Sequence, residues 1–148
     1  MKIKKNYILY KKYISSSPED TKKIAQNLAK EFKKGDIVAL IGQLGAGKTC
    51  FIKGIGKSYG IPNNEIASPT FVLLRIYNGK KSIYHFDLYR IKDYKELENI
   101  GYREFLTFAD LIVIEWADKL KEIYYDFNWI IKIDYISKKQ REIKIYKR

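Results

Sequence analysis

The residues with the clearest chemical potential lie in the stretch IGQLGAGKTC, at positions 41–50. Its glycines, lysine and threonine match the spacing G-x-x-x-x-G-K-[ST] of a phosphate-binding loop. Glycines let backbone N–H groups approach phosphate oxygens closely, the lysine can reach the β- and γ-phosphates, and the threonine hydroxyl can bind magnesium. We therefore predict that the phosphates are held by Gly42, Gln43, Leu44, Gly45, Ala46, Gly47, Lys48, Thr49 and Cys50.

The segments on either side of this loop support the prediction. The continuous apolar run IVALIG before it is typical of a strand buried on both faces. A helix is expected after it, from about Lys48 to Tyr59, with Gly60 as its C-terminal cap. The helix would add the favourable end of its dipole to the phosphate site.

A phosphate loop needs an acid on the metal side, and Glu115 is the candidate because it ends the apolar run LIVI. A parallel strand would point Glu115 toward the loop. The alternative is a solvated charge at a strand end. Trp116 follows directly in place of a second carboxylate, so a catalytic base must come from elsewhere. Trp116 itself could belong to the core or form a platform at the mouth of the site.

Two further segments carry candidate residues. Thr70, in SPT, lies where a nucleotide switch can sense the γ-phosphate, although the sequence alone favours an ordinary turn before a strand. In HFDLYR, strand alternation places His85, Asp87 and Tyr89 on one face. Asp87 could orient water or the metal, or cap the next helix. A lone histidine such as His85 is more often a structural hydrogen-bonding residue than a catalyst.

The remaining pattern predicts an α/β fold with a mixed sheet. A strand at 6–14 precedes a helix that starts at Ser17, with a capping box to Asp20, and runs to about Phe32. A hairpin turns at Asn78-Gly79, and the end of the chain forms a second hairpin around SKKQ. Short helices are expected in DYKELENIG, YREFLT and ADKLKEIYY, and a buried strand in DLIVIEW. Alternating strands and helices predict one domain over 1–148, with a parallel core and antiparallel hairpins.

Composition sets the broad class. The chain has 148 residues, one cysteine and a hydrophobic fraction of 46%, which favours a packed core without an internal disulfide. No run is long enough to cross a membrane, and the lysine-broken N-terminus does not resemble a signal peptide, so a cytoplasmic protein is expected. The net charge of +12 is compatible with nucleic-acid contact, or with an A/T-rich coding bias that scatters lysines over solvated faces.

Taken together, the motifs resemble one family. The segments GQLGAGKT, SPTF, HFDLYR, GYREF and IEW occur in the order and spacing of the TsaE family, also called YjeE. The resemblance extends from the SPEDT helix start to about Leu120. Two departures are visible: Gln43 stands where the family often has aspartate, and Ala117-Asp118 replaces a usual Pro-Glu.

The resemblance implies a bacterial P-loop ATPase needed to make threonylcarbamoyladenosine in tRNA, with the three-layer P-loop fold. It implies that residues 42–49 bind ATP phosphates and that Thr49 and Glu115 lie on the magnesium side. Lys48, Thr70, Asp87 and Glu115 would form the catalytic and nucleotide-responsive site. The partners would be the TsaD and TsaB proteins, with ATP hydrolysis resetting their complex between turnovers. Contact with tRNA would be weak or indirect.

Other functions share parts of this pattern. A small-molecule kinase is the main alternative; it would need an acceptor pocket and an arginine-bearing lid, for which Arg75, Arg90 and Arg103 are available. A GTPase is disfavoured because the chain has no [NT]-K-x-D segment. A nucleic-acid-binding module would not need the phosphate loop, and a transporter-type ATPase would need a glycine-rich signature segment.

Overall fold

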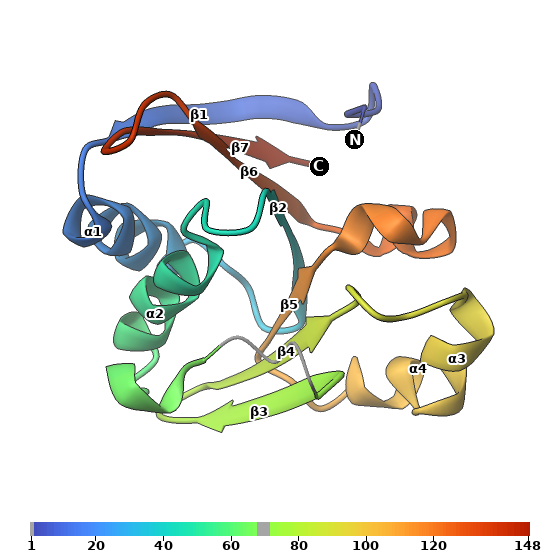
Figure 1. Cartoon of the computed structure of the whole chain (residues 1–148). Coiled ribbons are helices and arrows are strands. Elements are labelled where there is room, and N and C mark those ends of the chain that lie inside the picture. The colour runs from blue at the N-terminus through green and yellow to red at the C-terminus, as the bar shows by residue number, and fades with distance from the viewer. Residues whose placement is uncertain (1, 68–71) are drawn as a thin grey trace.

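The chain folds around a seven-stranded mixed sheet, as the computed structural model in Figure 1 shows. The structure describes residues 2–67 and 72–148. The strand order is β1-β7-β6-β2-β5-β4-β3. The strands are β1 (Ile8–Ser15), β2 (Asp36–Gly42), β3 (Leu74–Asn78), β4 (Ser82–Asp87), β5 (Leu111–Glu115), β6 (Trp129–Tyr135) and β7 (Arg141–Lys147).

Helices cover both faces of this sheet. The α-helices are α1 (Pro18–Ala29), α2 (Lys48–Ser58), α3 (Tyr94–Asn99) and α4 (Tyr102–Phe105). Short 3-10 helices are η1 (Asn63–Glu65), η2 (Ala117–Lys119) and η3 (Lys121–Asp126). In Figure 1, α1 and α2 lie on one side of the sheet, and α3 and α4 lie on the other. The predicted α/β fold with a helix–sheet–helix layering is therefore confirmed.

The centre of the sheet is parallel and its margins are antiparallel. Strand β2 pairs in parallel with β5 and β6, and β4 pairs in parallel with β5. Hairpins add β3 beside β4 and β7 beside β6, and β1 pairs antiparallel with β7. The residues of β5 are all buried, as expected for an apolar strand that is covered on both faces. The parallel core with antiparallel hairpins is thus confirmed.

Strand alternation divides the core into two layers. Val38 and Leu40 of β2 pack with the α1 and α2 side, together with Phe51 and Ile55 of α2. The intervening Ala39 packs in the opposite layer. In parallel strands the carboxyl ends meet at one edge, so the loop after β2 and the residues that end β4 and β5 are brought together.

The first helix begins as predicted but ends earlier. Ser17 is its N-cap, and the Ser17 hydroxyl accepts from the Asp20 N–H at 3.0 Å. The Asp20 carboxylate accepts from the N–H of Ser16 at 3.1 Å, one residue before the cap. The α-helix ends at Ala29, and the predicted extension to Phe32 is wrong. Phe32 is still buried, because its ring packs edge-on against Trp129.

Two other local predictions need correction. The first hairpin forms, but Asn78 pairs with Ser82 as the last residue of β3, so the turn consists of residues 79–81. A Cβ at Gly79 would lie 2.3 Å from the carbonyl oxygen of Tyr59, so glycine is required there for close approach. The predicted helix in ADKLKEIYY is instead the pair η2 and η3.

Among the described residues, no helix is long and apolar enough to span a bilayer.

Candidate functional site

The stretch between β2 and α2 has the backbone of a phosphate loop. Gly45 has φ 79° and Gly47 has φ 108°, a region that side-chain-bearing residues rarely adopt. A Cβ at Gly42 would lie 2.7 Å from the carbonyl oxygen of Ile133 on β6. Gly47 is the N-cap of α2 and offers no side chain there, so backbone N–H groups point to any ligand at this end. The glycine spacing is therefore required by the loop geometry.

Lys48 lies inside the loop. Its side chain is buried, and its ammonium group donates to the carbonyl oxygen of Gly42 at 2.5 Å. Burial lowers the pKa of Lys48, whereas the carboxylates of Glu115 and Asp87 act in the opposite direction. The ammonium group also lies 4.3 Å from the centroid of the Trp116 ring. Lys48 is thus held at the loop as a positive charge with several neighbours.

Two carboxylates end adjacent strands opposite this lysine. Asp87 of β4 is paired with Glu115 of β5 in the parallel register, and both side chains are buried. Burial raises the pKa of Asp87, while a hydrogen bond from the Tyr89 N–H at 2.9 Å lowers it. Glu115 Oε2 lies 3.1 Å from Nε2 of His85. The interpretation of Glu115 as a solvated strand end is therefore wrong.

These groups share a cavity of about 420 Å³, which we call the phosphate-loop cavity. The half-buried Thr49 lines it beside Lys48. Its walls are formed by Leu44, Gly45, Gly47, Lys48, Thr49, Cys50, Asp87, Tyr89, Glu115 and Trp116. The structure thus brings together most of the predicted site residues. The expectation for Thr70 lies outside the described residues, and Gln43 is exposed on a neighbouring smaller cavity.

Trp116 has an unusual backbone. At φ 57° it is the one non-glycine residue with positive φ among the described positions. The strained turn directly after β5 brings its half-buried indole into contact with the Lys48 ammonium group and with the Tyr89 ring, whose centroid lies 5.1 Å from that of the indole. Trp116 is therefore a wall of the site, in agreement with the platform alternative.

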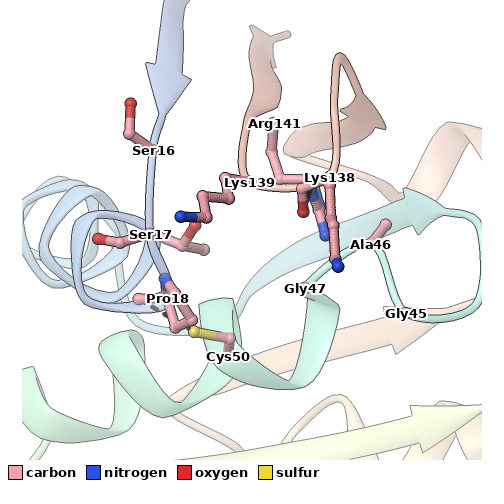
Figure 2. A pocket seen from close by; sticks show the side chains of 11 residues that line it. Ser16, Ser17, Pro18, Gly45, Ala46, Gly47, Cys50, Lys138, Lys139 and Arg141 are labelled. Atoms are coloured by element: carbon pink, nitrogen blue, oxygen red, sulfur yellow. Dashed lines mark hydrogen bonds between the residues drawn. The ribbon is translucent and has the colours of Figure 1, made fainter.

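A second cavity of about 510 Å³ lies on the other side of the loop and is shown in Figure 2. Lys138 and Lys139 descend from the β6–β7 hairpin toward Gly47 and the start of α1 (Figure 2). Arg141 stabilises the turn of that hairpin, because its guanidinium donates a hydrogen bond to the carbonyl oxygen of Ser137 at 3.0 Å. The lysine pair was assigned to a solvated face, since nothing in the local sequence shows that a hairpin 90 residues later folds over the loop.

Cys50 lies between the two cavities. Its thiol is half-buried and donates to the carbonyl oxygen of Pro18 at 3.1 Å. Burial raises the pKa of this thiol, so it is a poor nucleophile. Cys50 thus contributes its backbone and a packing contact with α1 to the site.

Comparisons with known proteins agree with this geometry. The family model described as "Threonylcarbamoyl adenosine biosynthesis protein TsaE" matches residues 15–143. The chain belongs to the TsaE family. The match includes every residue that lines the phosphate-loop cavity, all of β6 and the start of β7. The resemblance stated from the motifs is confirmed.

Individual TsaE proteins match most of this chain. A tRNA threonylcarbamoyladenosine biosynthesis protein TsaE of Treponema pallidum is 34% identical over 132 residues, which cover 89% of this chain and 97% of the relative. The protein of that name from Rickettsia conorii is 46% identical over 109 residues, 73% of this chain and 62% of the relative. A crystal structure of Bacillus subtilis YdiB superposes with a TM-score of 0.72 at 30% identity, covering 95% of this chain and 87% of that chain.

The arginines considered for a kinase lid have other surroundings. Arg103 pairs with Asp126 at 3.1 Å and donates to Tyr94 at 3.1 Å, in the layer of α3 and α4. Arg75 lies on the edge strand β3, opposite His85. The structure thus gives no support to a lid built from these two residues, and the kinase alternative is not favoured by the TsaE relatives.

Proposed function

We propose that this chain binds ATP with Mg²⁺ in the phosphate-loop cavity and hydrolyses it as a component of tRNA threonylcarbamoyladenosine biosynthesis. It would act as a single P-loop domain with the TsaD and TsaB proteins and reset their complex between turnovers. The observation that carries this proposal is the convergence of Lys48, Asp87 and Glu115 on one cavity at the end of a complete phosphate loop. Family membership supports the biosynthetic role.

The residues of the cavity fit a magnesium ion. Among the described residues, no group of three or more His, Cys, Asp or Glu side chains forms a dedicated metal cage. Magnesium does not need one, since it is usually held by one or two carboxylates, waters and the phosphates themselves. Thr49 and Glu115 line the cavity together and would hold the ion. When bound, Mg²⁺ would neutralise charge that develops on the β- and γ-phosphates.

The side chains have separable roles in hydrolysis. Lys48 would leave the Gly42 carbonyl and pair with the phosphates, supported by the inward N–H groups of the loop. Asp87 would hold the attacking water, because burial raises its pKa toward that of a more effective proton acceptor. Trp116 would exclude water from one side of Lys48.

The second cavity is suited to the nucleoside half of ATP. It adjoins Gly45, Gly47 and Cys50, so a ligand whose phosphates occupy the loop can extend into it. Thr21 and Ser17 provide polar groups on the α1 side, and the Lys138–Lys139 pair closes it from above (Figure 2). A cavity of about 510 Å³ is within the common range of about 300–1,000 Å³ for ligand sites.

Two exposed side chains indicate that a partner protein covers the mouth of the phosphate-loop cavity. Leu44 is 87% exposed at the tip of the loop, and Tyr89 is 51% exposed beside Trp116. Exposed apolar groups at the mouth of a site are typical of a surface that a second protein covers. We therefore expect slow hydrolysis by the free chain. The net charge of +12 would speed association with an acidic partner or a tRNA-loaded complex, and added salt would weaken this effect.

The proposal is tested by binding to a purified TsaD–TsaB complex with ATP, with ADP and without nucleotide. We expect one nucleotide state to bind at least about tenfold more tightly, a coupling of about 1.4 kcal/mol. The same samples are examined for transfer of the γ-phosphate of ATP. Release of inorganic phosphate agrees with the proposal, whereas a phosphorylated metabolite together with nucleotide-independent binding supports the kinase alternative.

A further inference from the structure

A buried chain of polar side chains leads away from the phosphate-loop cavity. Glu115 Oε2 lies 3.1 Å from His85 Nε2, and His85 Nδ1 lies 3.3 Å from the Tyr77 hydroxyl. The Tyr77 hydroxyl donates to the carbonyl oxygen of Ala67 at 2.8 Å. Relative exposures are 2% for Glu115, 0% for His85 and 5% for Tyr77. This series of polar contacts connects a wall of the cavity with the backbone before β3 through three side chains that are shielded from water.

The register of the sheet explains why Glu115, His85 and Tyr77 lie next to one another. His85 of β4 lies opposite Val113 of β5, so Glu115 is its diagonal neighbour on that side. On the other side, Tyr77 of β3 lies opposite Ile83, which makes it the diagonal neighbour of His85 as well. Diagonal pairs on one face of a sheet are within reach of long and aromatic side chains. His85 therefore sits on the middle strand and uses both ring nitrogens, one toward each flanking strand.

Donor and acceptor roles follow from the carboxylate. An ionised Glu115 can only accept, so His85 Nε2 must carry the hydrogen in their contact. A turn of the imidazole ring would break the buried hydrogen bond from Nε2 to Glu115, which is costly. One oxygen of Glu115 is thereby fixed while the side chain still lines the cavity. The Tyr77 hydroxyl has a single hydrogen and two neighbouring acceptors, the carbonyl oxygen of Ala67 at 2.8 Å and His85 Nδ1 at 3.3 Å, so it donates to only one of them at a time.

We propose that His85 is a positioning residue for Glu115 and, through Tyr77, connects that carboxylate to the backbone at Ala67. This inference depends on the proposed role of Glu115 toward magnesium. Its physical basis is that partners behind a metal-binding side chain orient the side chain and tune its affinity. His85 itself touches neither the nucleotide nor the ion in this assignment.

The test measures ADP binding by calorimetry, once with Mg²⁺ and once with EDTA. His85→Gln can place an amide N–H near the position of Nε2, whereas His85→Asn places its amide near Nδ1 and leaves Glu115 without a donor. For His85→Asn we expect the gain in affinity from Mg²⁺ to fall by about tenfold, which is the lower end of such effects at metal sites. His85→Gln should recover most of the gain. ADP affinity in EDTA should stay within about twofold of the parent in both variants, because the loop and Lys48 are unchanged.

A second arm keeps His85 intact and removes one hydroxyl. Tyr77→Phe is compared with Tyr84→Phe, whose hydroxyl makes no hydrogen bond within the described part of the chain. Hydrogen exchange of the Ala67 amide is measured with and without Mg-ADP. We expect Mg-ADP to change its exchange rate in the parent and in Tyr84→Phe, and to leave it unchanged in Tyr77→Phe. This arm remains informative if His85→Asn does not fold.

The outcomes separate this inference from the proposed function. One outcome is that ADP binds to the parent but not to Lys48→Ala, while magnesium increases ADP affinity equally in the parent, His85→Asn and His85→Gln. In that case the positioning role is wrong and the proposed function stands. Equal losses with and without magnesium also contradict it, since they indicate a general structural role. If ADP affinity is changed neither by Lys48→Ala nor by magnesium, the proposed function and this inference are both contradicted.

Discussion

The ammonium group of Lys48 lies 4.3 Å from the centroid of the Trp116 indole ring. This contact and the hydrogen bond to the Gly42 carbonyl oxygen hold the ammonium group at the loop. In the proposed function, nucleotide binding would exchange these partners, a carbonyl oxygen and an aromatic face, for phosphate oxygens. Charge-assisted bonds to phosphate are stronger than either contact, so the proposed exchange would be favourable.

Removal of the Lys48 charge should weaken ATP binding without unfolding the protein. For Lys48→Ala we expect a loss of about 1.5–3 kcal/mol in calorimetry, which corresponds to about a tenfold to hundredfold weaker affinity. The matched control is Lys57→Ala, an exposed lysine near the other end of α2. If the folded Lys48→Ala variant binds ATP as tightly as Lys57→Ala, the assignment of the phosphate loop is incorrect.

Neutralisation of Glu115 should separate metal binding from structure. Glu115→Gln keeps the shape of the side chain, and its amide oxygen can still accept from His85 Nε2. Magnesium-dependent hydrolysis should fall by at least about tenfold, since a metal-side charge is lost, while the melting temperature changes little. Glu104→Gln, on an exposed part of α4, is the control. Hydrolysis at the parent rate would show that Glu115 does not serve the ion.

The packing of α1 against α2 depends on Gly54. A Cβ at this position would lie 2.3 Å from the Lys22 carbonyl oxygen and 2.7 Å from the Ala25 Cβ. At an exposed helix position, Gly→Ala stabilises by about 1 kcal/mol. Here we expect Gly54→Ala to lower the free energy of unfolding by about 1–3 kcal/mol, because backbone atoms of α1 would have to move. Urea unfolding measures this change in the free energy of unfolding. A variant as stable as the parent would mean that α1 and α2 accommodate the extra Cβ without cost.

Alkaline pH should selectively weaken the packing of Tyr7. Its hydroxyl donates to the carbonyl oxygens of Phe127 at 2.7 Å and Tyr124 at 3.0 Å, and burial raises its pKa from 10.0 to about 12. Because the folded-state pKa is the higher one, the folded state retains the proton longer than the unfolded chain. The stabilisation is complete below pH 10.0 and is lost as pH rises through about 12.

The comparison that isolates this effect is Tyr7→Phe against the parent in denaturant titrations at several pH values. At neutral pH the parent should be more stable by about 1–2 kcal/mol, from the loss of buried hydrogen bonds in the variant. The difference should shrink between pH 10 and pH 12, because the unfolded parent loses the Tyr7 proton in this range while the folded parent keeps it, so folding then requires proton uptake. A difference that is constant over this range would show that Tyr7 is not responsible.

Local patterns predicted the elements that carry the site. The apolar runs before Gly42 and Glu115 identified the buried strands β2 and β5, because a strand covered on both faces is apolar throughout. The motif placed Lys48 and Thr49 at the start of α2. These features depend on residues within a few positions of one another, so a single sequence contains them.

Features that depend on distant packing were not predictable. The end of α1 at Ala29 and the 3-10 helices after Trp116 reflect contacts with other elements, which helical periodicity does not include. The fold of Lys138 and Lys139 over the phosphate loop requires the β6–β7 hairpin to lie beside β2 and α1. The Glu115–His85–Tyr77 chain requires the register of three strands, and register follows from the whole sheet.

ATP bound at this loop is expected to let the tRNA-modifying complex turn over repeatedly. The most direct measurement is a reconstituted modification assay with TsaD, TsaB, a source of the activated threonylcarbamoyl intermediate, tRNA, threonine, bicarbonate and ATP. With this protein present we expect many modified tRNAs per complex; without it, or with Lys48→Ala in its place, we expect at most about one, since resetting requires nucleotide bound at the loop. Repeated turnover without the protein, or full support by Lys48→Ala, would contradict the account.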